Sequence, residues 1–133
     1  MLLRDTHVSV EHEGDIITAR QLARSVAIDQ GFSGSDLTRI ATAISEIARN
    51  ILIYAQRGEI ILSGEQVGTR RGILVVARDA GPGIANIEQA MADGFSTGKT
   101  LGLGLPGAKR LMDEFEIVSK IGVGTTVTMR KWV

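Results

Sequence analysis

Alternating apolar and polar side chains mark the start of the chain. Over residues 7–13 the alternation has the period of two that predicts a strand. Over residues 16–27 the apolar positions recur every three or four residues, which predicts a helix. Asp15 is a residue type that caps helix N-termini and Gly31 one that ends helices, so we expect them to bound this helix.

A second and more regular helical pattern follows. Ser35 or Asp36 is expected to cap it, and Gly58 to end it. Its apolar stripe consists of Leu37, Ile40, Ala41, Ile44, Ile47, Ala48, Ile51 and Leu52. Such a stripe predicts a helix that packs one face against a core. Because aromatic residues are only 4% of the chain, that core is expected to be aliphatic.

The remaining pattern mixes strands and helices. The expected elements are strands over 59–67 and 73–79 joined by a turn over 68–72, a short helix over 86–93, a polar loop over 94–103, a helix from near Pro106 to 113, and strands over 114–121 and 125–132 around a turn over 122–124. Grouped helices beside mostly antiparallel strands indicate an α/β sandwich with helices on one face of the sheet. No repeat or linker interrupts the 133 residues, so we expect one domain over 1–133.

Composition and charge exclude several classes of function. Fifteen Lys and Arg balance fifteen Asp and Glu, so the chain lacks the positive charge that grips nucleic acid or anionic membranes. Cysteine is absent, which excludes disulfide scaffolds, zinc fingers and thiol catalysis. No apolar run resembles a signal peptide or a membrane span. We therefore expect a cytoplasmic protein with no nucleic-acid or membrane partner.

Glycine is unusually frequent, with 16 residues against 2 prolines. The glycines gather over 79–83, 98–107 and 122–124, where the simplest interpretation is tight turns. Residues 102–107 match the dinucleotide pattern G-x-G-x-x-G, but they follow a polar loop and not a strand, so we reject that site. Residues 94–100 are one residue too short between their glycines for a P-loop, although Lys99 remains a candidate phosphate contact.

The second helix carries a polar pair beside its apolar stripe. Glu46 and Asn50 are four residues apart and therefore lie on one face. One interpretation is a solvated flank, with Glu46 paired to Arg49 or Arg39. The other is a reactive site, because an amide oxygen can ligate Mg²⁺ and a carboxylate one turn away can accept a proton.

Four short motifs occur in a characteristic order. They are Glu46-Ile47-Ala48-Arg49-Asn50, Asp79-Ala80-Gly81-Pro82-Gly83-Ile84, Gly102-Leu103-Gly104-Leu105 and Gly124-Thr125. Together they resemble the Bergerat-fold ATP site of the GHKL superfamily, which includes gyrase, heat-shock chaperone ATPases, histidine kinases, mismatch-repair ATPases and bacterial anti-sigma kinases. The resemblance implies a two-layer α/β sandwich with a mixed, mostly antiparallel sheet.

Length and histidine placement narrow the resemblance. Gyrase-like and repair ATPases need further domains, and histidine kinases need a phosphoacceptor histidine, whereas His7 and His12 lie in or near the first predicted strand. Residues 43–50, 93–97 and 103–115 resemble the anti-sigma-factor-type serine/threonine kinases, in particular the switch kinases of the RsbT type from the bacterial stressosome. The short loop before Gly102 implies a small ATP lid, which argues against slow trapping of ATP.

The resemblance assigns roles to the motif residues, with ATP and Mg²⁺ as cofactors. Glu46 is expected to be the catalytic base towards a protein serine or threonine hydroxyl, and Asn50 the magnesium ligand. The expected nucleotide contacts are Asp79 to the adenine amino group, Gly81 and Gly83 beside the base, Lys99, Gly102, Leu103 and Gly104 around the phosphates, and Thr125 closing the adenine side. The simpler interpretation of Asp79 is that it caps the turn at Ala80-Gly81.

The resemblance also implies protein partners. We expect STAS-domain proteins as substrates and a PP2C-type phosphatase as a second partner. The alternative is an anti-sigma-type protein that binds ATP and acts mainly by sequestering a partner. Arg20 and Arg24, one turn apart on the first helix, are a candidate docking surface. Whether the protein is a monomer or a homodimer stays open.

Overall fold

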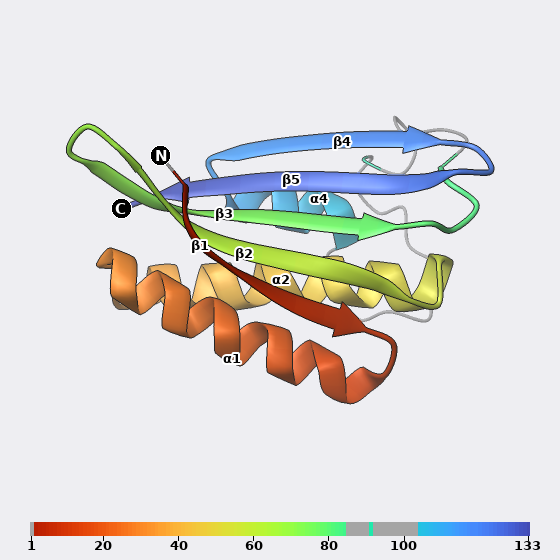
Figure 1. Ribbon diagram of the computed structural model, residues 1–133, viewed down its shortest axis with the longest axis horizontal. Coiled ribbons are helices and arrows are strands. Elements are labelled where there is room, and N and C mark those ends of the chain that lie inside the picture. Colours follow the sequence, from red (N-terminus) through yellow and green to blue (C-terminus); the bar gives the residue numbers. More distant parts are fainter. Residues whose placement is uncertain (1, 85–90, 92–103) are drawn as a thin grey trace.

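The computed structural model describes residues 2–84, 91 and 104–133. Figure 1 shows a layer of strands covered by helices. The elements are β1 (Leu2–Val10), α1 (Glu13–Gln30), α2 (Ser35–Tyr54), β2 (Gly58–Val67), β3 (Arg70–Asp79), α4 (Gly104–Leu111), β4 (Glu114–Lys120) and β5 (Gly124–Trp132).

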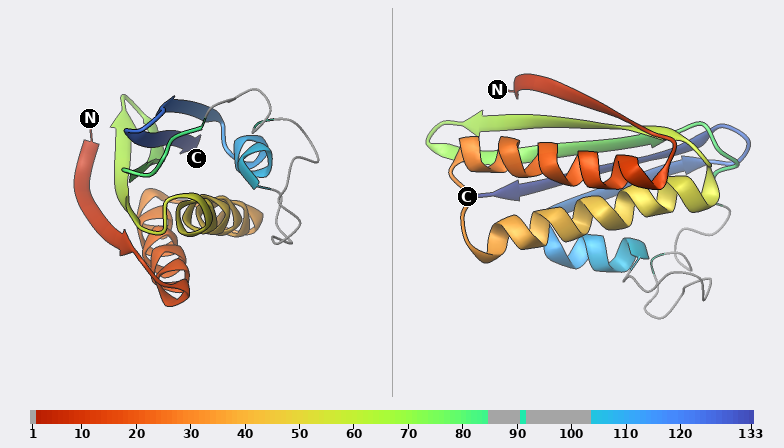
Figure 2. Two further views of the ribbon diagram at one scale, coloured as in Figure 1. Left: turned by 90° about the vertical axis from the view of Figure 1, so that its right-hand side faces the viewer. Right: turned by 90° about the horizontal axis from the view of Figure 1, so that it is seen from below.

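The strands form one sheet in the order β1-β2-β3-β5-β4. All four pairings between the described strands are antiparallel, so the predicted mostly antiparallel sheet is confirmed and no parallel pairing is found among these strands. Figure 2 shows the helices on one side of the sheet. The predicted two-layer α/β sandwich is confirmed.

An aliphatic core joins the two layers. The apolar stripe of α2 is buried at Ile40, Ile44, Ile47 and Ile51, against strand residues that include Leu62. Burial of a side chain of this size contributes about 1.5–3 kcal/mol. Because these residues pack against the sheet, α2 is held in place. The polar residues beside the stripe therefore have fixed orientations.

The start of α1 corrects one prediction. The N-cap is His12, and Asp15 lies three residues inside it. The Asp15 carboxylate accepts hydrogen bonds from the backbone N–H groups of Glu11, at 2.8 Å, and His12, at 3.0 Å. These two backbone hydrogen bonds lower the pKa of Asp15. Asp15 therefore satisfies free N–H groups at the helix start, although from inside the helix.

The end of α2 corrects a second prediction. The helix ends at Tyr54, and Gln56 takes the left-handed conformation with φ 70°. Gly58 instead begins β2, where a Cβ atom would lie 2.6 Å from the carbonyl oxygen of Arg78 and 2.8 Å from Ile51 Cγ2. Glycine is required at 58 by close packing of β2 against its neighbours.

Other boundaries also differ from the prediction. The first strand spans residues 2–10 and not 7–13, and the N-cap of α2 is Gly34 and not Ser35 or Asp36, with no side-chain cap hydrogen bond. Val67 pairs with Arg70, so the hairpin turn holds only Gly68 and Thr69, and Gly68 has the positive φ of 61° that a two-residue turn favours. Helix α4 ends at Leu111, two residues before the predicted end. The predicted C-terminal hairpin is confirmed, and Gly31 ends α1 with φ 104°. The predicted helix over 86–93 and loop over 94–103 lie essentially outside the described residues.

Candidate active site

Four of the described elements direct their ends towards one side of the molecule. In Figure 1 the C-terminal ends of α2 and β3 and the start of β5 point to the right, and the start of α4 faces the same way. In the view from below in Figure 2, α4 lies beside α2. This arrangement brings the predicted motifs on α2, β3, α4 and β5 to one end of the sandwich.

Glu46 joins two of the predicted motifs. Its side chain is buried, with 6% of the residue exposed, and Oε1 lies 2.9 Å from Nη1 of Arg49. Oε2 accepts a hydrogen bond of 2.7 Å from the backbone N–H of Gly104, the first residue of α4. The predicted pairing with Arg49 is confirmed and the solvated flank is wrong, because α4 covers this carboxylate. Arg39 instead binds Asp36.

Asn50 follows Glu46 by one helical turn and is half-buried. Within the part of the chain that the structure describes, its amide has no hydrogen-bond partner. The same described residues contain no group of three or more His, Asp or Glu side chains that could hold a metal ion. The amide oxygen of Asn50 is one oxygen ligand of the kind that Mg²⁺ binds.

Asp79 ends β3 and ties together the loop that follows it. Its Oδ1 accepts hydrogen bonds from the backbone N–H of Gly81, at 2.9 Å, and of Thr125, at 3.3 Å. The interpretation of Asp79 as a turn cap is therefore confirmed. Oδ2 has no hydrogen-bond partner among the described residues, so one acceptor atom is left for a ligand.

Thr125 lies opposite Asp79 in the β3–β5 pairing and is buried, with 6% exposed. Its Oγ1 lies 2.8 Å from Oγ of Ser119, which in turn accepts a hydrogen bond of 2.7 Å from the backbone N–H of Ile84. Our reading of the sequence missed Ser119. The predicted hairpin held the signal, because symmetric pairing around its turn places Ser119 opposite Thr125.

Gly81 and Gly83, in the motif that begins at Asp79, pack closely against other parts of this chain. A Cβ atom at Gly81 would lie 2.6 Å from Cβ of Ala55, just after α2. Gly83 has φ 79°, and a Cβ there would lie 2.5 Å from the carbonyl oxygen of Lys120. Close packing at these two glycines holds the loop after β3 against the end of α2 and against the β4–β5 turn. Their predicted approach to a base stays a prediction.

Three predicted nucleotide contacts lie outside the described residues. They are Lys99, Gly102 and Leu103, so their predicted roles stay predictions. Gly104 is described, and its N–H is directed at a carboxylate.

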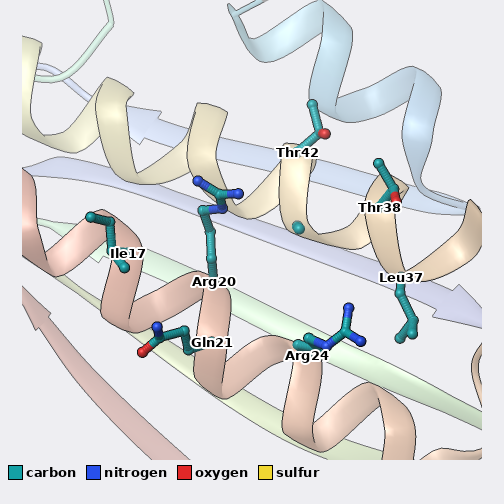
Figure 3. Close-up of a pocket in the computed structure, with 8 residues that line it drawn as sticks. Ile17, Arg20, Gln21, Arg24, Leu37, Thr38 and Thr42 are labelled. Carbon is teal, nitrogen blue, oxygen red and sulfur yellow. The ribbon is translucent and has the colours of Figure 1, made fainter.

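A second feature is a groove of about 430 Å³ between α1 and α2. Its lining residues are Ile17, Arg20, Gln21, Arg24, Leu37, Thr38, Ala41 and Thr42. Figure 3 shows Arg20 reaching from α1 towards α2, with Arg24 one turn further along. No lining residue is acidic, and neither guanidinium group has an ion-pair or hydrogen-bond partner in the described residues.

Comparison with known proteins agrees with this arrangement. Residues 9–131 match the family model described as the histidine kinase-like ATPase domain. The chain is 52% identical over 128 residues to "Serine/threonine-protein kinase RsbT" of Bacillus subtilis (strain 168), covering 95% of both chains. It is 34% identical over 106 residues to "Anti-sigma F factor" of Geobacillus thermodenitrificans (strain NG80-2), covering 74% of this chain and 70% of the relative.

A solved structure supports the fold. The chain matches the crystal structure of the RsbU and RsbW domains of a Mycobacterium tuberculosis protein with a TM-score of 0.66 and 21% identity. The match covers 97% of this chain and 32% of that one. No helix in the described part of the chain combines the length and apolar character needed to cross a membrane.

Proposed function

The chain belongs to the family of histidine kinase-like ATPase domains, and from this premise we infer that it is an ATP-dependent serine/threonine protein kinase of a partner-switching signalling system. The observation that carries the inference is the contact between the buried Glu46 carboxylate and the first N–H of α4. A helix N-terminus favours phosphate, so this contact sets a carboxylate beside a phosphate-binding position. The 52% identity to a serine/threonine kinase agrees with that chemistry.

Two described residues fit the nucleotide and its metal. Asn50 offers an amide without a partner in the described residues, and it would hold Mg²⁺, which neutralises phosphate charge when bound. Asp79 keeps Oδ2 as an acceptor for the adenine amino group. Lys99, Gly102 and Leu103 complete the proposed phosphate contacts, and Gly81, Gly83 and Thr125 the adenine side.

Glu46 is proposed to remove the proton of the acceptor hydroxyl. Both of its carboxylate oxygens are engaged, one by Arg49 and one by Gly104. A phosphate oxygen at the start of α4 would compete with Oε2 for the Gly104 N–H. We therefore propose that nucleotide binding frees Oε2, so that the base becomes available only when ATP is in place.

The proposed partners are STAS-domain proteins as substrates and a PP2C-type phosphatase, in the cytoplasm. Phosphoryl transfer tests the substrate class. The protein is incubated with ATP labelled on the γ-phosphate and with STAS-domain proteins of the same organism. We expect Mg²⁺-dependent label on a serine or threonine of one of them. Label that stays in ATP or appears only as free phosphate with every STAS-domain protein would contradict the proposed substrate class.

A second candidate function is sequestration of a partner, and the groove between α1 and α2 favours it. Arg20 and Arg24 have no acidic neighbour among the lining residues, so charge complementarity selects an acidic segment of a regulatory partner protein. The likeness to an anti-sigma F factor supports this candidate. Sequestration and phosphorylation can use one surface, because a kinase must also hold its substrate.

Charge reversal separates the groove from the nucleotide site. The double variant Arg20→Glu with Arg24→Glu should bind the STAS-domain partner at least about tenfold more weakly, because two attractive charges become repulsive. Its ATP affinity should stay unchanged. Arg4→Glu, an exposed arginine on β1, is the matched control. Equal partner affinity in the double variant and the control would exclude the groove as the docking site.

A further inference from the structure

A chain of hydroxyl and backbone groups links the loop after β3 to Thr125. Ser119 is half-buried on β4 and lies opposite Thr125 on β5. Its Oγ lies 2.7 Å from the backbone N of Ile84 and 2.8 Å from Thr125 Oγ1. A longer contact of 3.4 Å joins the same Oγ to the carbonyl oxygen of Gly124.

The contacts fix the direction of one of these hydrogen bonds and leave two arrangements for the other. The Ile84 N–H can only donate, so Ser119 Oγ accepts from it. The hydroxyl proton of Ser119 then goes either to Thr125 Oγ1 at 2.8 Å or to Gly124 at 3.4 Å. The shorter distance is the usual one for O–H···O and the longer lies beyond it. A serine oxygen can also accept from Ile84 and Thr125 together, so the distances by themselves allow either hydroxyl to be the donor. In the inference below, Ser119 donates to Thr125 over the shorter distance, and the Thr125 proton points away from Ser119.

The direction of the hydrogen bond between the two hydroxyls decides whether Thr125 offers a donor to a ligand. When Ser119 donates to one of its two lone pairs, Thr125 keeps its proton for a group on its other side and presents a donor there. Asp79, its partner across the β3–β5 pair, presents Oδ2 as an acceptor. The two side chains therefore offer an acceptor and a donor side by side.

We propose that Ser119 is a positioning residue for base selectivity, which acts by holding the Thr125 hydroxyl as a donor. The inference rests on the proposed function, in which Asp79 and Thr125 face the base of ATP. Adenine presents an amino donor next to the acceptor N1, the complement of an acceptor beside a donor. Guanine presents a carbonyl acceptor next to an N–H donor, which opposes both groups.

Removal of the Ser119 hydroxyl should relax this selection. In Ser119→Ala the Thr125 hydroxyl can rotate and either donate or accept. Asp79 still favours ATP, but the share of selectivity that Thr125 supplies is lost. We expect the ratio of ATP to GTP affinity to fall about fivefold to tenfold, the usual effect of one neutral hydrogen bond. KM for ATP should rise while kcat at saturating ATP stays unchanged, because Ser119 touches no reacting group.

The test is a competition titration of ATP and GTP against a fluorescent ATP analogue. Ser119→Thr keeps a hydroxyl at the same position and should restore the parent ratio. Ser63→Ala is the matched control, because Ser63 is a buried serine, 2% exposed, whose hydroxyl binds Asp5 away from this end. Its ratio should equal the parent's. Circular dichroism checks each fold, and Ser119→Cys, with a weak thiol donor, replaces Ser119→Ala if that variant does not fold.

A double-mutant cycle shows whether Ser119 acts through Thr125. In a Thr125→Val background, adding Ser119→Ala should leave the ATP/GTP ratio unchanged. Two results would overturn the role of Ser119 without affecting the adenine site. One is an ATP/GTP ratio that Ser119→Ala leaves unchanged. The other is a fall in this ratio that is equal in the parent and Thr125→Val backgrounds. A parent that binds GTP as tightly as ATP would instead overturn the adenine site, and the inference with it.

Discussion

Glu46 shows how much a single residue's surroundings change its interpretation. Its local pairing with Arg49 follows from helical spacing, so the sequence could predict it. Its bond to Gly104 spans 58 positions, and no local pattern encodes such a contact. The bond makes Glu46 a cap for α4 as well as the proposed base.

The two roles of Glu46 can be separated by two variants. Glu46→Ala leaves the first N–H of α4 without its acceptor, so we expect a loss of about 0.5–2 kcal/mol in the free energy of unfolding. Glu46→Gln keeps an oxygen that can accept from Gly104 and should lose less. Urea unfolding of both variants measures the difference. Equal losses would mean that the cap contributes nothing.

Asn50 should affect nucleotide binding only through the metal. Asn50→Ala removes the one described side chain proposed to hold Mg²⁺, so ATP affinity should fall when Mg²⁺ is present and change little in EDTA. Titrations of parent and variant under both conditions decide this. A loss of the same size with and without Mg²⁺ would assign Asn50 a structural role.

Asp79 has a confirmed structural contact and a proposed ligand contact on different oxygens. Asn at this position can still accept from Gly81 and Thr125, so the fold should persist. Asp79→Asn should nevertheless weaken ATP binding and narrow its advantage over GTP, because an amide is an uncharged acceptor and can turn its donor outward. Competition titration gives both affinities. If Asp79→Asn matches the parent for both nucleotides, Asp79 is a turn cap only.

At the scale of elements, the hydrophobic pattern predicted the helix and strands whose apolar faces are buried. The stripe of α2 and both hairpins were predicted from sequence, because their apolar periods of 3.6 and 2 reflect which faces are covered. The ends of elements were predicted less well. Gly58 resembles a helix stop in sequence, yet close packing between β2 and β3 requires it, and such contacts leave no local signal.

The start of α1 supplies a prediction about acid stability. The Asp15 pKa is lowered in the fold by two backbone hydrogen bonds, so the ionised carboxylate stabilises the native state. That stabilisation is complete above the unfolded pKa of about 4 and is lost as pH falls through the lower folded pKa. Asp15→Asn should lower Tm at pH 7 and differ less from the parent near pH 2.

Thermal melts of Asp15→Asn, the parent and Glu13→Gln test this across pH. Glu13 is an exposed acid in the same first turn. Its variant controls for the general effect of a negative charge at a helix start. A Tm difference between Asp15→Asn and the parent that is the same at pH 7 and pH 2 would contradict the role of the ionised Asp15 carboxylate.

At the scale of the molecule, the sandwich brings distant motifs to one end. The order of the motifs and their resemblance to a known ATP site predicted this convergence, and the Glu46–Gly104 and Asp79–Thr125 contacts confirm two of its connections. The hairpin pairing places Ser119 opposite Thr125, but the contact of Ser119 with Ile84 and the groove volume could not be predicted from spacing, because both depend on how elements pack. Ion pairs of Arg130 with Glu65 and Glu114 lie towards the other end of the sheet.

Phosphoryl transfer by Glu46→Gln tests the central claim, that this end of the molecule is the active site of a protein kinase. The parent and the variant are given ATP labelled on the γ-phosphate, Mg²⁺ and a STAS-domain protein as the proposed substrate, with ATP affinity measured on the same samples. We predict equal ATP affinity within about twofold and transfer that is about 10²–10⁴-fold slower in the variant, the usual contribution of a general base. Transfer at the parent's rate by a variant that binds ATP normally would contradict the account.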